Sequence, residues 1–274
     1  MKREVELQRR LRSLSTLGEA VGAMKSLSAH HFREARKAVG PARSYREGVE
    51  RILICSGASL ASGDGAAGLL VIGGELGLCG GYNTQMIEAG AKRRAELGEG
   101  PTFCVGQRAA TLLGRRKVEV TRIYHGPTSV VGIPGLLLEL AEDVLTTFAN
   151  ENLSSFDFVA SRFSGVGTAS PTTVRLLPIE PSVVDGRRRA RYVGDDHFSG
   201  AVIREFLYVT IYGLLLDSLA SEHGARLAAT EAAETWLEER TERLHRHLMA
   251  TRREASTQEM IEIAAGARVR RRNP

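Results

Sequence analysis

A glycine-rich stretch, residues 73–81, has the composition of a loop that could hold a phosphate group. It follows an apolar run typical of a buried strand and precedes a predicted helix, which is where nucleotide-binding loops occur. The stretch lacks the GxGxxG spacing, no Gly-Lys-Ser or Gly-Lys-Thr follows it, and Glu75 places a negative charge where a phosphate would lie. We therefore predict a tight structural turn, with no cofactor bound there.

Other side chains could act as a nucleophile or as metal ligands. Cys79 would lie at a helix N-terminus, where a thiol can become reactive, but no nearby histidine or acid suggests a base for it. The pairs His30-His31 and His245/His247 are adjacent or two apart, so their side chains diverge around a helix. The sequence therefore predicts neither a catalytic centre nor a metal site.

The composition, 43% apolar and 25% charged, is ordinary for a globular protein. The three cysteines are far apart and form no CxxC motif, which indicates free thiols in a reducing cytosol. The N-terminus lacks the apolar segment of a secretory signal. The longest apolar run, residues 206–216, is far shorter than the roughly 20 residues of a transmembrane helix, so no membrane span is expected.

The net charge of +5 is concentrated at the N-terminus. Residues 1–51 hold 12 Lys and Arg against 6 Asp and Glu. This excess favours a partner with an acidic surface, or nucleic acid, although a solvated helix face would also account for it. A second basic cluster, residues 268–274, could contact nucleic acid or lipid head groups, or could be a frayed terminus.

The middle of the chain alternates between strand and helix patterns. Strands are predicted at residues 68–73, 102–105, 118–124, 156–160 and 173–177. Helices are predicted at residues 82–97, at 107–116 and from Pro134 to about 148. Strands separated by helices of this length indicate βαβ units and a mainly parallel sheet.

Long helical patterns occupy both ends of the chain. Residues 4–37 contain no proline and carry apolar residues in mixed three- and four-residue steps, with Gly18 at one seam position; Gly40-Pro41 should break or kink this helix. Residues 201–267 also lack proline. We expect the two helices to form an antiparallel coiled coil, because each must bury an apolar stripe.

The seam of the C-terminal helix weakens toward its end. It is apolar at Leu237, Leu244 and Leu248 but polar at Gln258 and Glu262. Since such positions bury little apolar area, this tip should stand as a single helix or be surrounded by a sleeve from a larger assembly.

The expected architecture is therefore α/β plus coiled coil, with long antiparallel N- and C-terminal helices flanking a Rossmann-like α/β domain with a mainly parallel sheet. The predicted boundaries are an N-terminal coiled-coil helix at 1–56, the α/β domain at 57–200, and a C-terminal coiled-coil helix with a basic tail at 201–274.

Three segments together resemble the gamma subunit of F-type ATP synthases. The first is Ala23-Met24-Lys25 within the N-terminal helix, and the second is Gly77-Leu78-Cys79-Gly80-Gly81-Tyr82-Asn83 after the first strand. The third is C-terminal, residues 219–227 followed by residues 257–267 with Thr-x-Glu and a late Gly-Ala. Their order and spacing agree with the family over essentially the whole chain.

The resemblance implies a non-catalytic rotor shaft. In the family the paired helices lie inside a ring of three alpha and three beta subunits, and the α/β domain meets the epsilon subunit and the membrane-embedded c-ring. The protein would then be a peripheral membrane protein at the cytoplasmic face of the plasma membrane, in contact with the membrane only through the c-ring. The match assigns contacts with the alpha/beta ring to Met24, Lys25, Thr257, Gln258 and Glu259.

The same match assigns the structural turn to Gly77, Cys79, Gly80 and Gly81. Departures from the family pattern occur at residues 18–22, 74–76 and 229–234, which suggests a divergent member. The alternate, sodium-translocating ATPases are one hypothesis for its type.

Two other functions compete with the rotor. One is a nucleotide-binding Rossmann-like enzyme with helical arms, which would bind nucleotide at residues 73–81. The other is a coiled-coil nucleic-acid binder that uses residues 2–51 and the arginine tail, whose binding would weaken steeply with salt. The rotor hypothesis expects neither nucleotide nor nucleic acid as a ligand of this chain.

Overall fold

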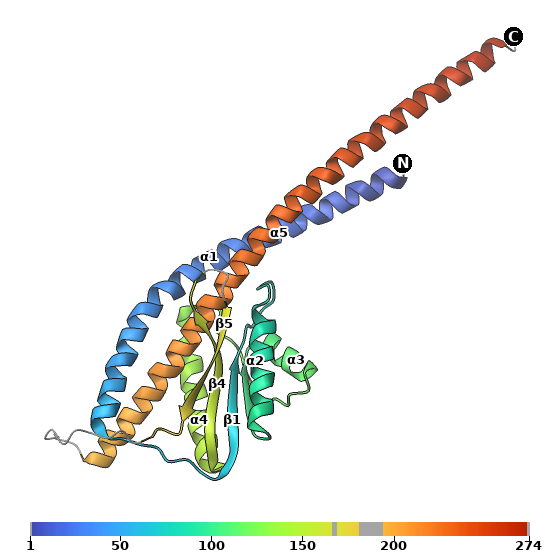
Figure 1. The fold of residues 1–274 in the computed structure, drawn as a ribbon. Helices are drawn as coiled ribbons and strands as arrows, with labels where there is room; N and C mark the ends of the chain where they lie inside the picture. The colour runs from blue at the N-terminus through green and yellow to red at the C-terminus, as the bar shows by residue number, and fades with distance from the viewer. Residues whose placement is uncertain (1, 166–168, 181–193, 273–274) are drawn as a thin grey trace. The chain divides into compact units, whose positions relative to one another are not determined.

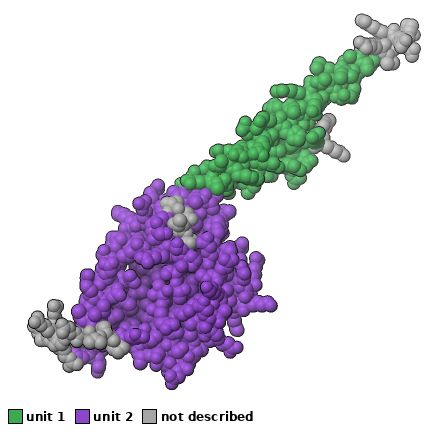
Figure 2. Space-filling view, viewed as in Figure 1, with its two compact units in different colours: residues 1–26, 230–274 green, residues 27–229 purple. Residues whose placement is uncertain are grey.

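The computed structural model describes residues 2–165, 169–180 and 194–272. Figure 1 shows their helices and strands. The elements are α1 (Lys2–Ser56), β1 (Gly65–Ile72), α2 (Tyr82–Leu97), β2 (Thr102–Val105), α3 (Gln107–Arg115), β3 (Arg122–Tyr124), η1 (Val130–Gly132), α4 (Ile133–Asn150), β4 (Leu153–Phe163), β5 (Ala169–Leu177) and α5 (Asp195–Arg272). Contacts divide the chain into a sheet unit, residues 27–229, and a helical unit, residues 1–26 with 230–274 (Figure 2).

The sheet unit is built on five strands in the order β3-β2-β1-β4-β5. The first four strands are parallel, and β5 pairs antiparallel with β4. The chain moves outward from β1 through β2 to β3 and then returns to the other side of β1 as β4. This reversal makes the carboxyl ends of β1 and β4 the topological switch point of the sheet, which is where ligands bind in many α/β proteins.

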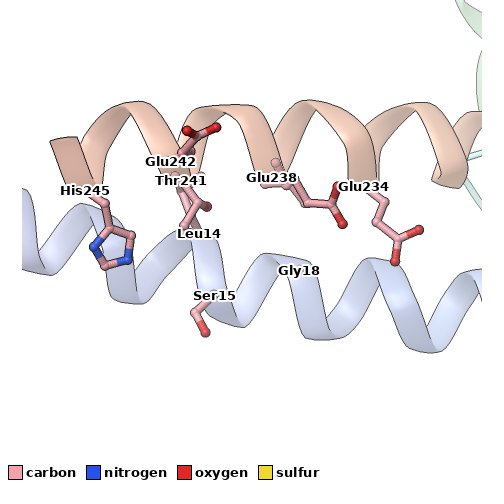
Figure 3. A pocket seen from close by; sticks show the side chains of 9 residues that line it. Leu14, Ser15, Gly18, Glu234, Glu238, Thr241, Glu242 and His245 are labelled. Carbon is pink, nitrogen blue, oxygen red and sulfur yellow. The ribbon is translucent and has the colours of Figure 1, made fainter. Parts of the chain in front are cut away.

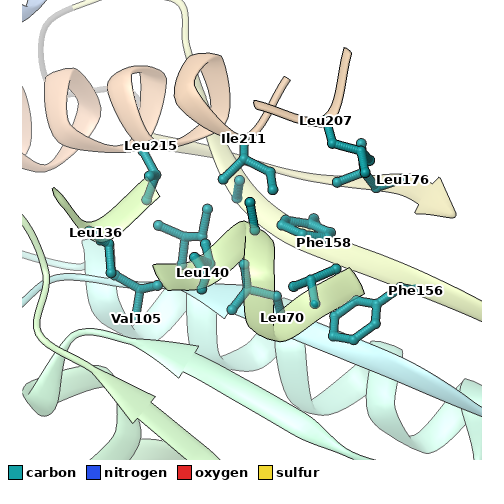
Figure 4. Packing of buried hydrophobic residues seen from close by; sticks show 14 of the residues in the cluster. Leu70, Val105, Leu136, Leu140, Phe156, Phe158, Leu176, Leu207, Ile211 and Leu215 are labelled. Carbon is teal, nitrogen blue, oxygen red and sulfur yellow. The ribbon is translucent and has the colours of Figure 1, made fainter. Parts of the chain in front are cut away.

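Alternating side chains build a core on each face of the sheet. Leu70 and Ile72 of β1 face a cluster that includes α4 and the parts of α1 and α5 in this unit, whereas Leu69 and Val71 face a smaller cluster with α2 and α3. Figure 4 shows Leu140 of α4 and Ile211 of α5 packed with Leu70 and Phe158. Both faces are covered, as an internal parallel sheet requires.

The helical unit is an antiparallel pair formed by the two ends of the chain. Arg252 Nε donates to Glu4 Oε1 at 2.7 Å at one end of the pair, and Lys25 Nζ donates to Glu234 Oε2 at 2.6 Å at the other. Leu7, Leu237 and Leu248 are buried between the helices. The part of α5 beyond Arg252, which runs past this contact with α1 to Arg272, is its single-helix part.

The predicted mainly parallel sheet and the two long terminal helices are confirmed, but several details differ. Of the break or kink expected at Gly40-Pro41, the break was wrong, since α1 continues through Pro41 to Ser56. The third strand is shorter than the predicted 118–124, and α5 begins at Asp195 instead of residue 201. The helix reaches Arg272, so residues 273–274 of the expected basic tail lie outside the described residues.

By length and composition alone, α5 contains an 18-residue window that could cross a membrane, with a mean hydropathy of 1.4. Its apolar side chains have another role within the sheet unit. Val202, Leu207 and Ile211 of α5 belong to the core cluster against the sheet. Core packing therefore accounts for part of the apolar composition of this helix.

Candidate functional site

The glycine-rich turn lies directly after β1, at the switch point of the sheet. Leu78 and Gly80 adopt left-handed backbone conformations, with φ of 58° and 54°, and the Tyr82 amide donates to the Cys79 carbonyl at 3.1 Å. Gly80 takes this conformation without the steric cost that Leu78 bears. The turn ends at Gly81, which precedes the first residue of α2.

Glu75 places its carboxylate at the N-terminus of α3. Its carboxylate accepts hydrogen bonds from the amides of Gln107, at 3.0 Å, and Gly126, at 2.8 Å, and lies 3.1 Å from His125 Nδ1. Gln107 is the first residue of α3, so a side chain of the protein already takes the anion-binding helix terminus. Burial would raise the pKa of Glu75, but these hydrogen bonds outweigh it and lower the pKa.

Asn83 closes the remainder of the loop. Its Oδ1 accepts from the Gly74 amide at 2.7 Å, and its Nδ2 donates to the Leu76 carbonyl at 3.4 Å. A side chain at Gly73 would collide with Ala109, since an added Cβ would come within 2.3 Å of the Ala109 Cβ. Gly73 therefore serves close packing between the loop and α3.

Helix α5 anchors the turn through a buried cluster of charge. Arg226, only 2% exposed, forms an ion pair with Glu222 and donates from Nε to the Gly77 carbonyl at 3.1 Å. His223 accepts from Arg226 through Nδ1 at 3.2 Å and donates through Nε2 to the Thr128 carbonyl at 3.1 Å, which assigns it the neutral Nε2–H form. These contacts connect α5, the turn and the loop before α4 within the sheet unit.

Cys79 lies inside this anchored turn as a neutral thiol. Burial, followed by the charge of Glu222, raises its pKa, which disfavours the thiolate that a nucleophile requires. Cys79 and Cys104 are buried and Cys55 is exposed, and all three are free, as the sequence predicted.

The residues assigned to the alpha/beta ring fall into two groups within the helical unit. Met24 and Lys25 lie near the end of the helix pair, and Lys25 forms an ion pair with Glu234 of the same chain. Thr257, Gln258 and Glu259 are all exposed on the single-helix part of α5. Gln258 Nε2 donates only along its own helix, to Glu262 Oε1 at 3.0 Å. The second group therefore offers the more accessible surface.

The single-helix part of α5 also exposes large apolar side chains. Met260 is 62% exposed, Ile261 57% and Ile263 72%. Three such residues within four positions leave apolar area in water, a pattern that marks an interaction surface. The sequence analysis identified this segment but did not single out these residues, although their apolar character outside the 4-3 seam was a readable signal.

A groove lies between the two helices of the helical unit. It has a volume of about 560 Å³ and is lined by Leu14, Gly18, Leu237 and Thr241 together with Glu234, Glu238 and Glu242 (Figure 3). No atom lies within 4 Å of a Cβ built on Gly18. The missing side chain at this seam position accounts for the hollow.

Comparisons with known proteins decide the family. A family model described as ATP synthase matches residues 4–269. The chain belongs to the ATP synthase gamma family. The ATP synthase gamma chain of Pelotomaculum thermopropionicum is 30% identical over 279 residues, covering 96% of this chain and 97% of that protein. The gamma chain of Moorella thermoacetica is 29% identical with the same coverage.

Solved structures of the family share the fold. A chain of the Euglena gracilis mitochondrial ATP synthase aligns with a TM-score of 0.70 at 14% identity, covering 98% of this chain and 94% of its own length. A chain from the central stalk and c-ring of the Tetrahymena thermophila enzyme aligns with a TM-score of 0.62 at 18% identity, covering 78% and 99%. This gamma-family chain therefore combines a mainly parallel sheet with two long terminal helices, as they do.

The polar contacts around the turn could not be predicted from the sequence. Glu75, Asn83, Glu222, His223 and Arg226 form the polar interior around the turn, and none of them was predicted to hold it in place. Residues 219–227 carried part of the resemblance, so Arg226 was within a recognised segment. Its contact with Gly77 is separated by 149 positions in the chain, and no local pattern encodes it.

Proposed function

We propose that this gamma-family chain is the central rotor shaft of a rotary ATP synthase, coupling ion translocation through a membrane c-ring to ATP synthesis or hydrolysis in an alpha/beta ring. Its partners are the alpha and beta subunits, the epsilon subunit and the c-ring. The match over residues 4–269 is the observation that carries this proposal, because it includes both the sheet unit and the two ends of the chain.

The shaft works by contact and has no catalytic site of its own. The single-helix part of α5, with Thr257, Gln258 and Glu259 beside the exposed apolar residues 260–263, faces the inside of the alpha/beta ring. An asymmetric helix can favour a different conformation of each beta subunit only if its contacts with those conformations differ in free energy. Rotation then changes which subunit is favoured.

Met24 and Lys25 contribute a second contact with the alpha/beta ring. The ammonium group of Lys25 forms an ion pair with Glu234, so Lys25 meets the alpha/beta ring with its charge already paired. The turn at Gly77, Cys79, Gly80 and Gly81 has a structural role, and Arg226 holds it by donating to the Gly77 carbonyl while it pairs with Glu222 and contacts His223.

The chain is a peripheral membrane protein at the cytoplasmic face of the plasma membrane, held there through the c-ring. For the segments of the chain we keep as a proposal an N-terminal helix at 1–56, the α/β domain at 57–200 and a C-terminal helix with its basic tail at 201–274, although α5 already begins at Asp195. The ion that the c-ring carries, proton or sodium, is a property of the ring and not of this chain.

Co-expression with alpha and beta subunits tests the proposal. The chain should co-purify with both as one complex that hydrolyses ATP, whereas the isolated chain should not hydrolyse ATP. Calorimetry of the isolated chain should detect no nucleotide binding, because Glu75 and Asn83 fill the loop after β1. ATP turnover by the isolated chain, or saturable nucleotide binding abolished by changes in residues 73–81, would favour the Rossmann-like enzyme instead.

A further inference from the structure

Two histidines and a glutamate gather on α1 within the sheet unit. His30 Nε2 lies 3.5 Å from Glu34 Oε2, and His31 Nδ1 lies 3.7 Å from the same oxygen. The three ligand atoms all lie within 4.8 Å of one another. Glu34 follows His30 by four residues and His31 by three, so one turn of helix brings its carboxylate between the two imidazoles.

His31 supplies a second observation. Its Nδ1 is buried and has no hydrogen-bond partner among the described residues, although its side chain as a whole remains 17% exposed. A buried polar atom without a partner costs free energy, so it requires an explanation such as an ion. This nitrogen is the one that approaches Glu34.

The surroundings leave one side of the cluster open. The ring of His223 from α5 lies 5.2 Å from that of His31, but its nitrogens are already engaged by Thr128 and Arg226. His223 therefore packs against His31 and does not serve as a ligand. His30 and Glu34 are about half exposed, which leaves room for water to complete a coordination shell.

The ligand set suits a divalent transition metal. Imidazole nitrogen and carboxylate oxygen bind Zn²⁺ at about 2.0–2.2 Å, so ligand atoms in a tetrahedral site lie roughly 3.3–3.6 Å from one another. Both distances to Glu34 are already close to this spacing. We propose that His30, His31 and Glu34 form a binding site for one divalent ion of the zinc class, with Glu34 as the ligand shared between the two imidazoles.

The site revises the expectation drawn from the sequence. Adjacent histidines do diverge around a helix, but Glu34 supplies a third ligand that both can reach. The ion would hold His31 against the interior of the sheet unit and would stabilise that unit, since binding to the folded state alone raises its stability. The inference stands on these three side chains and does not rest on the rotor function.

Titration of the full-length chain with ZnCl₂ tests the site. The chain should carry no polyhistidine tag, and a Cys55→Ser background removes the exposed thiol. Calorimetry should show one equivalent of Zn²⁺, and a thermal melt should show a higher transition temperature with the metal. His30→Ala and Glu34→Gln should each weaken binding roughly ten-fold or more and abolish the thermal shift. Both side chains are about half exposed, so both variants should fold.

A double change of His245 and His247 to Ala is the matched control, because it removes two other histidines and should leave Zn²⁺ affinity unchanged. CoCl₂ gives a second readout, since its visible absorption should appear in the parent chain and be lost in Glu34→Gln. Absence of saturable Zn²⁺ binding up to about 1 mM would overturn the proposal. So would binding that His30→Ala or Glu34→Gln leaves unchanged, or that the control variant removes.

Discussion

At the scale of single residues, Glu222 and Arg226 form a buried ion pair in the sheet unit. Burial raises the pKa of Glu222, and the neighbouring charge of Arg226 opposes that shift. Breaking a buried pair from one side leaves an uncompensated charge, which is far more costly than removing both partners. Loss of one partner should therefore lower the free energy of unfolding more than loss of both, because the remaining charge would be buried without a partner.

Arg226→Ala should lower the free energy of unfolding by about 3–5 kcal/mol, because it leaves Glu222 buried and unpaired and frees the Gly77 carbonyl. Urea denaturation of the isolated chain measures this. The double variant Glu222→Leu with Arg226→Met should recover part of the loss, since both charges are gone. A single variant within about 1 kcal/mol of the parent would show that the pair does not anchor the turn.

His223 makes a separate, pH-dependent contribution. Burial, followed by the charge of Arg226, lowers its pKa to about 4, while the Thr128 carbonyl acts in the opposite direction. Between about pH 6.5 and pH 4 the unfolded chain therefore binds a proton at this site that the folded chain does not. Folding stability should fall as the pH drops through this window, by about 3 kcal/mol at most.

His223→Gln tests this contribution, because an amide can still donate to Thr128 but does not titrate. The free energy of unfolding of the variant should decline less steeply than that of the parent between pH 6.5 and pH 4. His245→Gln, on an exposed side chain of α5, is the control and should follow the parent curve. Parallel curves for the parent and His223→Gln would contradict the assignment.

Local sequence predicts the turn after β1 but not the residues that contact it. The turn at residues 73–81 could be predicted from its glycine content and its place between a strand and a helix. The partners of Glu75, Gln107 and Gly126, could not be predicted, because they lie 32 and 51 positions away and meet it only when the sheet assembles.

At the scale of elements, Gly18 of α1 weakens the packing of the helix pair in the helical unit. Gly18 lies at a seam position beside the groove of Figure 3, and nothing lies within 4 Å of the Cβ it lacks. Glycine in a helix interior also costs roughly 0.5–1 kcal/mol relative to alanine. Both effects weaken the pairing of α1 with α5 in the helical unit.

Gly18→Ala should therefore stabilise the helical unit by about 0.5–1 kcal/mol, measured as slower amide exchange in residues 7–25. Gly106→Ala should have the opposite effect on stability. Gly106 has a φ of 101°, and an added Cβ would lie 2.8 Å from the Gly74 carbonyl oxygen, so this change should destabilise the chain. Unchanged or faster amide exchange in residues 7–25 of Gly18→Ala would refute the role assigned to Gly18.

Some boundaries of helices and strands could be predicted from sequence patterns, whereas others depend on tertiary packing. Helix α2 and strand β2 match their predicted ranges, because strong turn signals bound them. The break at Pro41 was wrong, since Val39 and Leu53 are buried in the core and Arg43 pairs with Asp217 at 2.9 Å. These tertiary contacts outweigh the roughly 3 kcal/mol that a proline costs inside a helix.

At the scale of the whole molecule, the division into two units falls inside both long helices. The boundaries, after residues 26 and 229, carry no proline or glycine cluster that sequence reading could use. They depend on where contacts with the sheet end, and that is a property of the assembled fold. The fold class was readable from the sequence, but this division was not.

Changing Gln258 and Glu259 to Ala tests the contact surface of the shaft. Both side chains are exposed and contact only their own helix among the described residues, so the free energy of unfolding of the isolated chain should change by less than about 0.5 kcal/mol. ATPase activity of the assembled complex should nevertheless fall. Unchanged activity in a complex of normal composition would remove these two residues from the proposed contact.

Rotation of the shaft inside its complex is the most direct test of the account. Cys55 is exposed while Cys79 and Cys104 are buried, so a thiol-reactive optical probe can be attached at Cys55 of the sheet unit. With the alpha/beta ring fixed to a surface, addition of ATP should drive the probe in one direction, in steps of a third of a turn. A complex that hydrolyses ATP while a firmly attached probe remains stationary would contradict the rotor assignment.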